Sequence, residues 1–365
     1  MGQKSSAALF AEAFALRKQG KVRKALDIYR GLARAEPRHV DVHLQLGVLT
    51  GQTGALVEGE RILRRALTWS PDDARLRQAL GMNLMAQGQY AEGWAFYEAR
   101  HAVPAMALPA AEAFPFPQWR GEPLAGKRIA ILPEQGFGDQ IQFARFVPQM
   151  QAAGAEVTLL CPLELAALFT HSFPQAEVLV ATGAVSFPDP DYWTMAGGIV
   201  GRLGLSPDSL PSRPYLRTPV ATPPIPAGFK VGVQLSGNPQ HANDAHRSLP
   251  PDAAAALREQ LPARVIGLAP AETGARDFAQ TAAIIQALDV VVTVDTAVAH
   301  LAGAMGKLAL VLLPHFGTDW RWLRDRDDSP WYPSLRLYRR GARDADWTPT
   351  IRRLAHDVHA LASAG

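Results

Sequence analysis

Beyond residue 125, apolar residues occur in short continuous runs separated by stretches with helical periodicity. Six runs are predicted to be strands, at residues 128–133, 156–161, 230–235, 264–268, 289–294 and 308–314. Continuous rather than alternating runs are typical of strands buried on both faces, so we expect parallel sheets with helices on either side. A Pro-rich stretch at residues 217–230 divides the region in two. The pattern predicts two Rossmann-like α/β domains with a ligand cleft between them, at the carboxyl ends of the strands.

The first hundred residues are self-similar with a period of 34. Small residues recur in three columns: Gly20, Gly54 and Gly88; Ala25, Gly59 and Gly93; and Ala13, Gly47 and Gly81. Small side chains let paired helices approach closely. The period and residue types resemble three tetratricopeptide repeats, with helices at residues 6–18, 22–35, 39–52, 56–69, 73–86 and 90–100. The groove of such an array usually holds a peptide or a partner helix. Equally, the repeats could only stabilise the rest of the chain.

The fold class that we expect is α plus α/β, a helical solenoid followed by two Rossmann-like domains. Residues 103–125 are rich in Pro and Ala without helical period, which is typical of a linker. The expected order is a repeat domain (1–102), the linker (103–125), an N-terminal Rossmann-like domain (126–222), a C-terminal Rossmann-like domain (223–345) and a C-terminal helix (346–365).

Composition narrows the classes of function. The chain of 365 residues carries 37 basic and 34 acidic residues, a formal net charge of +3, and no long basic run, so we expect no nucleic-acid partner. The single cysteine, Cys161, excludes an internal disulfide and a cysteine-based zinc site. The N-terminus has no signal-peptide pattern, and no segment of about 18 uninterrupted apolar residues occurs. We therefore expect a cytoplasmic protein that does not insert into membranes.

Polar residues interrupt an apolar context in "TVDTAVAHLAGAMG", residues 293–306. We predict a buried strand ending at Val294, Asp295 as an N-cap, and a helix beginning at Thr296 or Ala297. The unpaired N–H groups and positive dipole end of such a helix favour an anion, and His300 lies one turn further on the same face as Thr296. Alternatively, Asp295 merely caps the helix and His300 packs in the core.

A glycine loop follows the first predicted strand, in "ILPEQGFGDQIQFARFVP" (131–148). Gly136 and Gly138 permit a tight loop, and Asp139 opens the next helix. Ile141 and Cys161 stand where a dinucleotide fingerprint needs a small and an acidic residue, which disfavours an NAD site. A lone carboxylate facing an anion site is placed for general-base catalysis. Asp139 as a simple helix cap is the competing interpretation.

Two further stretches carry candidate chemistry. In "VQLSGNPQHANDAHRSLP" (233–250), Arg247 is the best candidate to neutralise a diphosphate, with Asn238 and Ser248 nearby, although a solvated charged loop is the alternative. In "LLPHFGTDWRWLRDRDDSPWYP" (312–333), the aromatic residues could stack on a base or sugar, but a local core is favoured for most of them. The segment "DPD" (189–191) mimics a metal-binding motif by chance, so no metal is expected.

Together, the segments "EQGFGDQIQFARFVP", "SGNPQHANDAHRSLP", "TVDTAVAHLAGAMG" and "LPHFGTDWRW" resemble, in order, the bacterial heptosyltransferase-like glycosyltransferases of GT-B fold, in a branch that carries tetratricopeptide repeats. The resemblance implies Asp139 as catalytic base and Arg247 as a contact of the donor's phosphates. It also implies that Asp295, Thr296 and His300 hold the diphosphate. The remaining candidate donor-binding residues are Gly136, Gly138, Asn238 and Ser248, with Glu272, Thr318 and Asp319 as further candidates.

The chain departs from that family at two positions. Heptosyltransferases usually carry lysine where Arg247 stands, and repeat-bearing relatives commonly carry tryptophan at the position of Leu235. The repeats also resemble those of the eukaryotic O-GlcNAc transferase, whose catalytic motifs have no match here. The donor sugar and the shape of the pocket floor therefore stay open.

The function that we expect is inverting, metal-free transfer of a sugar from a nucleotide-sugar donor, with no other cofactor. The acceptor is expected to be a protein or peptide recruited by the repeat groove. Two alternatives remain: a catalytically inactive transferase fold whose repeats bind a protein partner, and a sugar-nucleotide epimerase that uses Glu134, Glu272 and His241.

Overall fold

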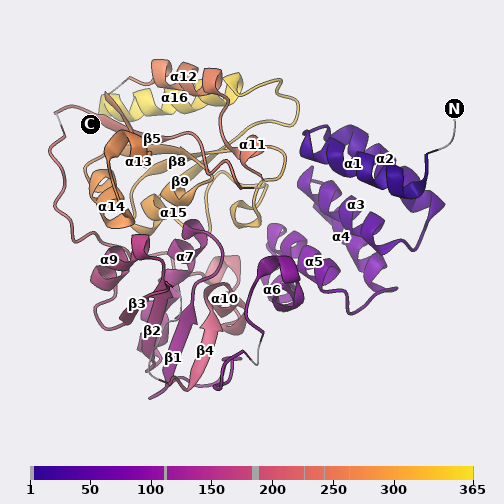
Figure 1. The fold of residues 1–365 in the computed structure, drawn as a ribbon. Helices are drawn as coiled ribbons and strands as arrows, with labels where there is room; N and C mark the ends of the chain where they lie inside the picture. The colour runs from indigo at the N-terminus through magenta and orange to yellow at the C-terminus, as the bar shows by residue number, and fades with distance from the viewer. Residues whose placement is uncertain are drawn as a thin grey trace. The chain divides into compact units, whose positions relative to one another are not determined.

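The computed structural model describes residues 4–110, 113–182, 189–225, 227–241, 243–262 and 264–364. The chain forms two compact units. The first, which we call the repeat unit, is Met1–Ala110 with Phe316–Arg324; the second, the α/β unit, is Ala111–His315 with Asp325–Gly365. Figure 1 labels the elements of both units.

The repeat unit is built from consecutive pairs of helices (Figure 1). Its described helices are α1 (Ser6–Lys18), α2 (Val22–Ala35), α3 (Val40–Gln52), α4 (Leu56–Leu67), α5 (Ala74–Ala86) and α6 (Tyr90–Tyr97), followed by the short 3₁₀ helices η1 (Glu98–Ala102) and η2 (Pro104–Met106). The predicted helices are confirmed, with ends that shift by up to three residues. Asp73 shows why α5 begins at Ala74, because its carboxylate accepts hydrogen bonds from the backbone N–H groups of Arg75 and Leu76.

Two of the three small-residue columns bring paired helices together, as predicted. A Cβ atom added to Gly81 on α5 would lie 2.6 Å from the backbone nitrogen of Tyr97 and 2.7 Å from the backbone oxygen of Gly93, both on α6. The third column has another role. Gly20, Gly54 and Gly88 lie in the turns within each pair, at φ angles of 72°, 100° and 77°, a left-handed conformation that favours glycine.

A distant segment completes the repeat unit. Residues 316–324, which the sequence analysis assigns to the second α/β domain, cluster with the repeat helices. Trp320, in the 3₁₀ helix η6 (Trp320–Trp322), makes edge-to-face contacts with Tyr90 and Trp94 at ring-centroid distances of 5.9 and 5.5 Å. Arg324 donates a hydrogen bond of 2.9 Å to the backbone oxygen of Gln52 at the end of α3.

The α/β unit contains two parallel sheets. The first has the order β3-β2-β1-β4 and the second β6-β5-β7-β8-β9. The strands are β1 (Arg128–Leu132), β2 (Glu156–Cys161), β3 (Glu177–Val180), β4 (Tyr192–Met195), β5 (Lys230–Gln234), β6 (Arg264–Gly267), β7 (Val290–Val294), β8 (Ala309–Leu313) and β9 (Leu335–Arg339). All six predicted strands are present, and so is the predicted fold class, helical repeats followed by two Rossmann-like domains of the kind that make up a GT-B fold.

Short helices connect and cover these sheets. In the first domain they are α7 (Phe137–Phe143), η3 (Ala144–Phe146), α8 (Val147–Ala152), α9 (Leu163–Ser172), η4 (Ala196–Gly198), α10 (Ile199–Arg202) and η5 (Pro207–Ser209). In the second they are α11 (Asp244–Arg247), α12 (Pro251–Gln260), α13 (Pro270–Thr273), α14 (Phe278–Gln286), α15 (Ala297–Ala304) and the C-terminal α16 (Thr348–Ala364).

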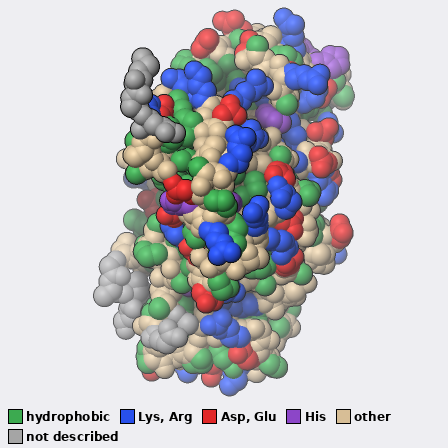
Figure 2. Space-filling model, turned by 90° about the vertical axis from the view of Figure 1, so that its right-hand side faces the viewer, with side chains coloured by type: hydrophobic (Ala, Val, Ile, Leu, Met, Phe, Trp, Pro, Cys, Tyr) green, Lys and Arg blue, Asp and Glu red, His purple; other side chains and the backbone are tan. Residues whose placement is uncertain are grey.

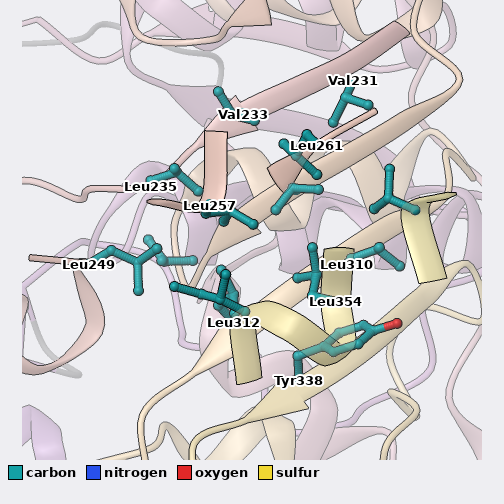
Figure 3. Packing of buried hydrophobic residues seen from close by; sticks show 14 of the residues in the cluster. Val231, Val233, Leu235, Leu249, Leu257, Leu261, Leu310, Leu312, Tyr338 and Leu354 are labelled. Atoms are coloured by element: carbon teal, nitrogen blue, oxygen red, sulfur yellow. The ribbon is translucent and has the colours of Figure 1, made fainter. Parts of the chain in front are cut away.

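The core of the second domain lies between its sheet and the helices α12 and α16. Every second residue of β5 and β7 points into it, because successive side chains of a strand alternate between the two faces. Figure 3 shows the side chains that meet there: Val231, Val233, Leu235, Leu249, Leu257, Leu261, Leu310, Leu312, Tyr338 and Leu354. Leu235 is thus a core residue at the end of β5.

The strand orders place two switch points, where neighbouring strands in the sheet are not consecutive in the chain. They lie between β1 and β4 in the first sheet and between β5 and β7 in the second. Ligands of open α/β sheets bind at the carboxyl ends of strands at such points. A ligand would therefore contact the loops that follow β1, β4, β5 and β7.

No described helix is long and apolar enough to cross a membrane. On the face drawn in Figure 2, basic and acidic side chains lie interspersed.

Candidate functional site

The loop after β1 holds Asp139 at the start of α7. Gln135 has a φ of 60°, a left-handed conformation that is uncommon for a residue with a side chain. Gly136 then leads into the helix, and its backbone N–H donates a hydrogen bond of 3.1 Å to Oδ2 of Asp139. Asp139 is therefore fixed in the first turn of α7, at its third residue, where the carboxylate caps the backbone N–H of the N-cap residue Gly136.

Glu134 joins this loop to the neighbouring strand end. Its side chain is buried, and Oε2 accepts a hydrogen bond of 3.1 Å from the backbone N–H of Gly197, just after β4. Gly197 has no room for a side chain, since an added Cβ would lie 2.7 Å from this same oxygen. This hydrogen bond connects the loop after β1 with the segment after β4, at the first switch point.

The loop after β7 differs from the prediction by one residue. The N-cap of α15 is Thr296, not Asp295, and the helix begins at Ala297. Both residue types are good N-caps, so the sequence does not choose between them. Oγ1 of Thr296 lies 3.2 Å from Oγ1 of the buried Thr293. The first backbone N–H groups of an α-helix have no acceptor within the helix, so this start is suited to an anion.

Arg247 connects the loops after β5 and β7. Its Nη1 donates a hydrogen bond of 2.9 Å to the backbone oxygen of Asp295, and its Nε pairs with Oδ1 of Asp244 at 3.1 Å. Ser248 accepts a hydrogen bond of 2.8 Å from the backbone N–H of Gly237. Because β5 and β7 are neighbours in the sheet, these side chains gather at the second switch point.

The two domains meet at these loops, within the α/β unit. Helix α7 packs against α15. A Cβ added to Gly138 would lie 2.8 Å from Cδ2 and 3.4 Å from Nε2 of His300, and 3.6 Å from Cα of Ala297. Only glycine allows this approach. The structure thus brings the loop of Asp139 together with the helix start of Thr296 and His300.

Other predicted residues take part in separate local contacts. Asn238 turns into its own loop, where its side-chain oxygen accepts from the backbone N–H of Gln240 at 3.0 Å. Glu272, after β6, lies 3.4 Å from Arg258. Thr318 and Asp319 belong to the repeat unit, and Asp319 pairs with Arg321.

The candidates for an epimerase follow three different strands. Glu134 is buried after β1, Glu272 follows β6, and His241 lies in the exposed part of the loop after β5. Nδ1 of His241 accepts a hydrogen bond of 3.2 Å from the backbone N–H of Asn243. In the same loop, burial and the nearby charge of Arg340 lower the pKa of His246. Within the described residues, no group of three His, Cys, Asp or Glu side chains is placed to hold a metal ion.

Arg145, which was not among the predicted residues, is buried beside the site. Its guanidinium lies 4.5 Å from the ring centroid of Tyr332, whose hydroxyl is 3.0 Å from Nδ1 of His300. The available signal was a lone arginine in the otherwise apolar context of "FARFVP". The aromatic residues Trp320, Trp322, Trp331 and Tyr332 are all buried, as the local-core interpretation expects, but they divide between the two units.

The chain matches no known protein-family model. Protein FlbA of Caulobacter vibrioides is 28% identical over 346 residues, a match that covers 81% of the chain and 57% of FlbA. The chain therefore spans little more than half the length of that relative. Among solved structures, it is similar to a family 9 glycosyl transferase from Veillonella parvula, with 10% identity, a TM-score of 0.47, and coverage of 68% of the chain and 100% of the other. It is also similar to ADP-heptose lps heptosyltransferase II of E. coli, with 14% identity, a TM-score of 0.41, and coverage of 65% and 99%.

Proposed function

We propose that the chain is a glycosyltransferase that moves a sugar from a nucleotide-sugar donor to an acceptor. The observation that carries the proposal is the packing of Gly138 against His300. This contact joins the loop that bears Asp139 to a helix start that suits an anion, each at the switch point of its own sheet. The four resembling sequence segments support the same class of reaction.

In this proposal the second domain binds the diphosphate of the donor. The backbone N–H groups at the start of α15 and the hydroxyl of Thr296 donate to phosphate oxygens, while Arg247 supplies positive charge. Arg247 is already paired with Asp244, which holds the guanidinium in one orientation beside Asp295. Such preorganisation lowers the cost of ordering the side chain when a ligand binds.

Asp139 is the proposed general base. Its carboxylate takes the proton from the acceptor's hydroxyl or amide as the oxygen or nitrogen of that group attacks the anomeric carbon. The bond between the anomeric carbon and the diphosphate oxygen breaks at the same time, and the electron pair leaves with the diphosphate. Attack from the face opposite to the leaving group inverts the anomeric centre, and this scheme uses neither a metal nor another cofactor.

We propose a protein or peptide as the acceptor, recruited by the repeats. Helical repeat arrays commonly bind extended peptides along their inner surface. The three 34-residue units of the sequence and the paired helices of the repeat unit support this part of the proposal.

The competing candidate is an inactive transferase fold that serves as a scaffold. Two observations favour it: Asp139 already serves as a helix cap, and Arg247 is already paired with a carboxylate. Both residues would then be explained by structure alone.

The substitution Asp139→Asn separates the two candidates. Asparagine keeps the size of the side chain and an oxygen for the N–H of Gly136, but cannot take a proton at neutral pH. An enzyme should release nucleoside diphosphate from UDP-, GDP-, ADP- or dTDP-sugars about a hundredfold or more slowly, because general bases contribute roughly 10²–10⁴-fold. Donor binding should persist.

Asp252→Asn is the matched control, because Asp252 also lies in the first turn of a helix, α12, but is exposed. It should leave turnover unchanged. A scaffold would bind none of these donors, and Asp139→Asn would change nothing that can be measured with them.

A further inference from the structure

In the α/β unit, the buried cation Arg145 packs against Tyr332, the residue that contacts His300. Arg145 is 3% exposed, and its guanidinium carbon lies 4.5 Å from the ring centroid of Tyr332 and 5.0 Å from that of Trp331. Cation–π contacts of this kind are strong when they are removed from water. Arg145 thus holds the aromatic pair from one side.

Hydrogen bonds fix this arginine and the backbone beside Tyr332. Nη1 of Arg145 donates to the backbone oxygen of Trp331 at 2.7 Å and to that of Pro211 at 3.1 Å, while Nε donates to the backbone oxygen of Gln142 at 2.9 Å. A guanidinium is a rigid planar fork, so several bonds of this kind orient it completely. These bonds fix the backbone of Trp331, and with it the position of the adjacent Tyr332 ring.

From the other side, Tyr332 packs on α15. The ring covers Gly303, where an added Cβ would lie 2.5 Å from Cδ1 of the tyrosine. Gly303 follows His300 by three residues on the helix, so both residues lie on the face that meets the ring. The tyrosine has no room to rotate away from the histidine.

The hydroxyl of Tyr332 lies 3.0 Å from Nδ1 of His300. The hydroxyl of Tyr332 also has a hydrogen bond with the hydroxyl of Tyr215. An imidazole nitrogen is a much better acceptor than a phenol oxygen, whose lone pairs are delocalised into the ring, so Tyr332 donates to His300. Burial, together with the neighbouring Tyr215, raises the pKa of Tyr332 well above its ordinary value, so its proton is retained.

We propose that Tyr332 is a positioning residue whose hydroxyl donates a hydrogen bond to Nδ1 of His300 and so fixes the neutral tautomer with the proton on Nε2. Nε2 lies on the side of the glycine loop, 3.4 Å from where a Cβ of Gly138 would stand. His300 therefore presents a fixed N–H donor beside Thr296. The proposed use of this N–H group, to hold an anionic oxygen of the nucleotide-sugar's diphosphate, rests on the proposed function.

The tautomer can be measured without any activity. The full chain is labelled with ¹⁵N-histidine, and long-range ¹H–¹⁵N correlation spectra are recorded. His300 is identified among the 10 histidines by the signals that His300→Gln removes. The wild-type spectrum should show an unprotonated Nδ1 and a protonated Nε2 for His300. In Tyr332→Phe, which keeps the ring over Gly303 and Arg145, this preference should be lost.

Tyr338→Phe is the matched control, since Tyr338 is also buried in the second domain but bonds to Asp357. It should leave the signals of His300 unchanged. A protonated Nδ1 in the wild type, or an unchanged His300 in Tyr332→Phe, would overturn the proposal. The wild-type spectrum alone tests the tautomer of His300, even if Tyr332→Phe does not fold.

Titration with nucleoside diphosphates then tests whether the N–H group of His300 contributes to ligand binding. Tyr332→Phe should weaken binding of UDP, GDP, ADP or dTDP about tenfold relative to Tyr338→Phe, because a hydrogen bond to a charged group is lost or misdirected. The predicted tautomer with no binding of any nucleotide would support the role of Tyr332 while contradicting the glycosyltransferase. The predicted tautomer with equal binding by both variants would overturn the link between His300 and the ligand.

Discussion

Arg247 joins two loops of the second domain through a single side chain, with one bond to the backbone oxygen of Asp295 and one to Asp244. The sequence could indicate that an arginine in this loop would face an anion. It could not indicate the backbone oxygen of Asp295 as a partner, because that bond depends on how the loop after β5 packs against the loop after β7. Likewise, a strand followed by Asp-Thr predicts a cap but not which of the two residues becomes it. At this scale, residue type predicts chemistry, and tertiary contacts decide the partner.

Cys161 gives a prediction about accessibility. Its side chain is fully buried at the end of β2, and burial raises the pKa of its thiol to about 12. The thiolate is the reactive form, so the native protein should react with a thiol reagent only when the first α/β domain opens. We expect labelling at a rate that follows global unfolding in increasing denaturant. Rapid, complete labelling of the native chain would show that this core is not closed.

At the scale of elements, the strands that the sequence missed are β3, β4 and β9, and all three are at sheet edges. An edge strand is covered less than a central one, so its sequence needs fewer apolar residues. β9 is interrupted by the exposed Arg336, and β3 has the exposed Glu177 followed by three half-buried residues. The central strands β1, β5, β7 and β8 are buried almost without interruption and were predicted from that pattern.

The repeat helices give a matched pair of glycine predictions. Gly81→Ala places a methyl group 2.6 Å from the backbone of α6, which cannot yield as a flexible side chain would, so we expect a loss of about 1–3 kcal/mol. Gly31→Ala, on α2, meets nothing within 4 Å and should stabilise by roughly 0.5–1 kcal/mol through helix propensity alone. Urea denaturation followed by circular dichroism measures both. The same sign for the two variants would mean that close packing does not govern this helix pair.

The segment of residues 316–324 predicts a long-range contribution to the repeat unit. Trp320 is buried against Tyr90 and Trp94, so Trp320→Ala should destabilise the repeat unit by roughly 3–5 kcal/mol. The helical circular-dichroism signal of this unit should melt earlier. Val57→Ala, at a position on α4 that is 73% exposed, is the control and should have little effect. An unchanged melting curve for Trp320→Ala would show that the segment is not part of the core of the repeats.

At the scale of the whole molecule, the fold class could be predicted because periodicity is a local property: a period of 34 for the repeats and continuous apolar runs for the parallel strands. The assignment of residues 316–324 could not, because nothing in that segment says which distant helices it contacts. The candidate site could be predicted in part. Its loops were predicted from strand ends, whereas the cluster of Arg145, Tyr332 and Gly303 behind His300 required the packing of α15.

The central claim is that Arg247 and the start of α15 hold the diphosphate of a nucleotide. Titration calorimetry and thermal unfolding with UDP, GDP, ADP, CMP and dTDP test it most directly. The account predicts that one nucleoside diphosphate binds and, at 100 times its dissociation constant, stabilises the chain by about 2.7 kcal/mol. Arg247→Gln should weaken that binding about tenfold or more, since a charged hydrogen bond is lost, while Arg276→Gln at an exposed position should not. Binding of none of the five, or equal binding by the wild type and Arg247→Gln, would contradict it.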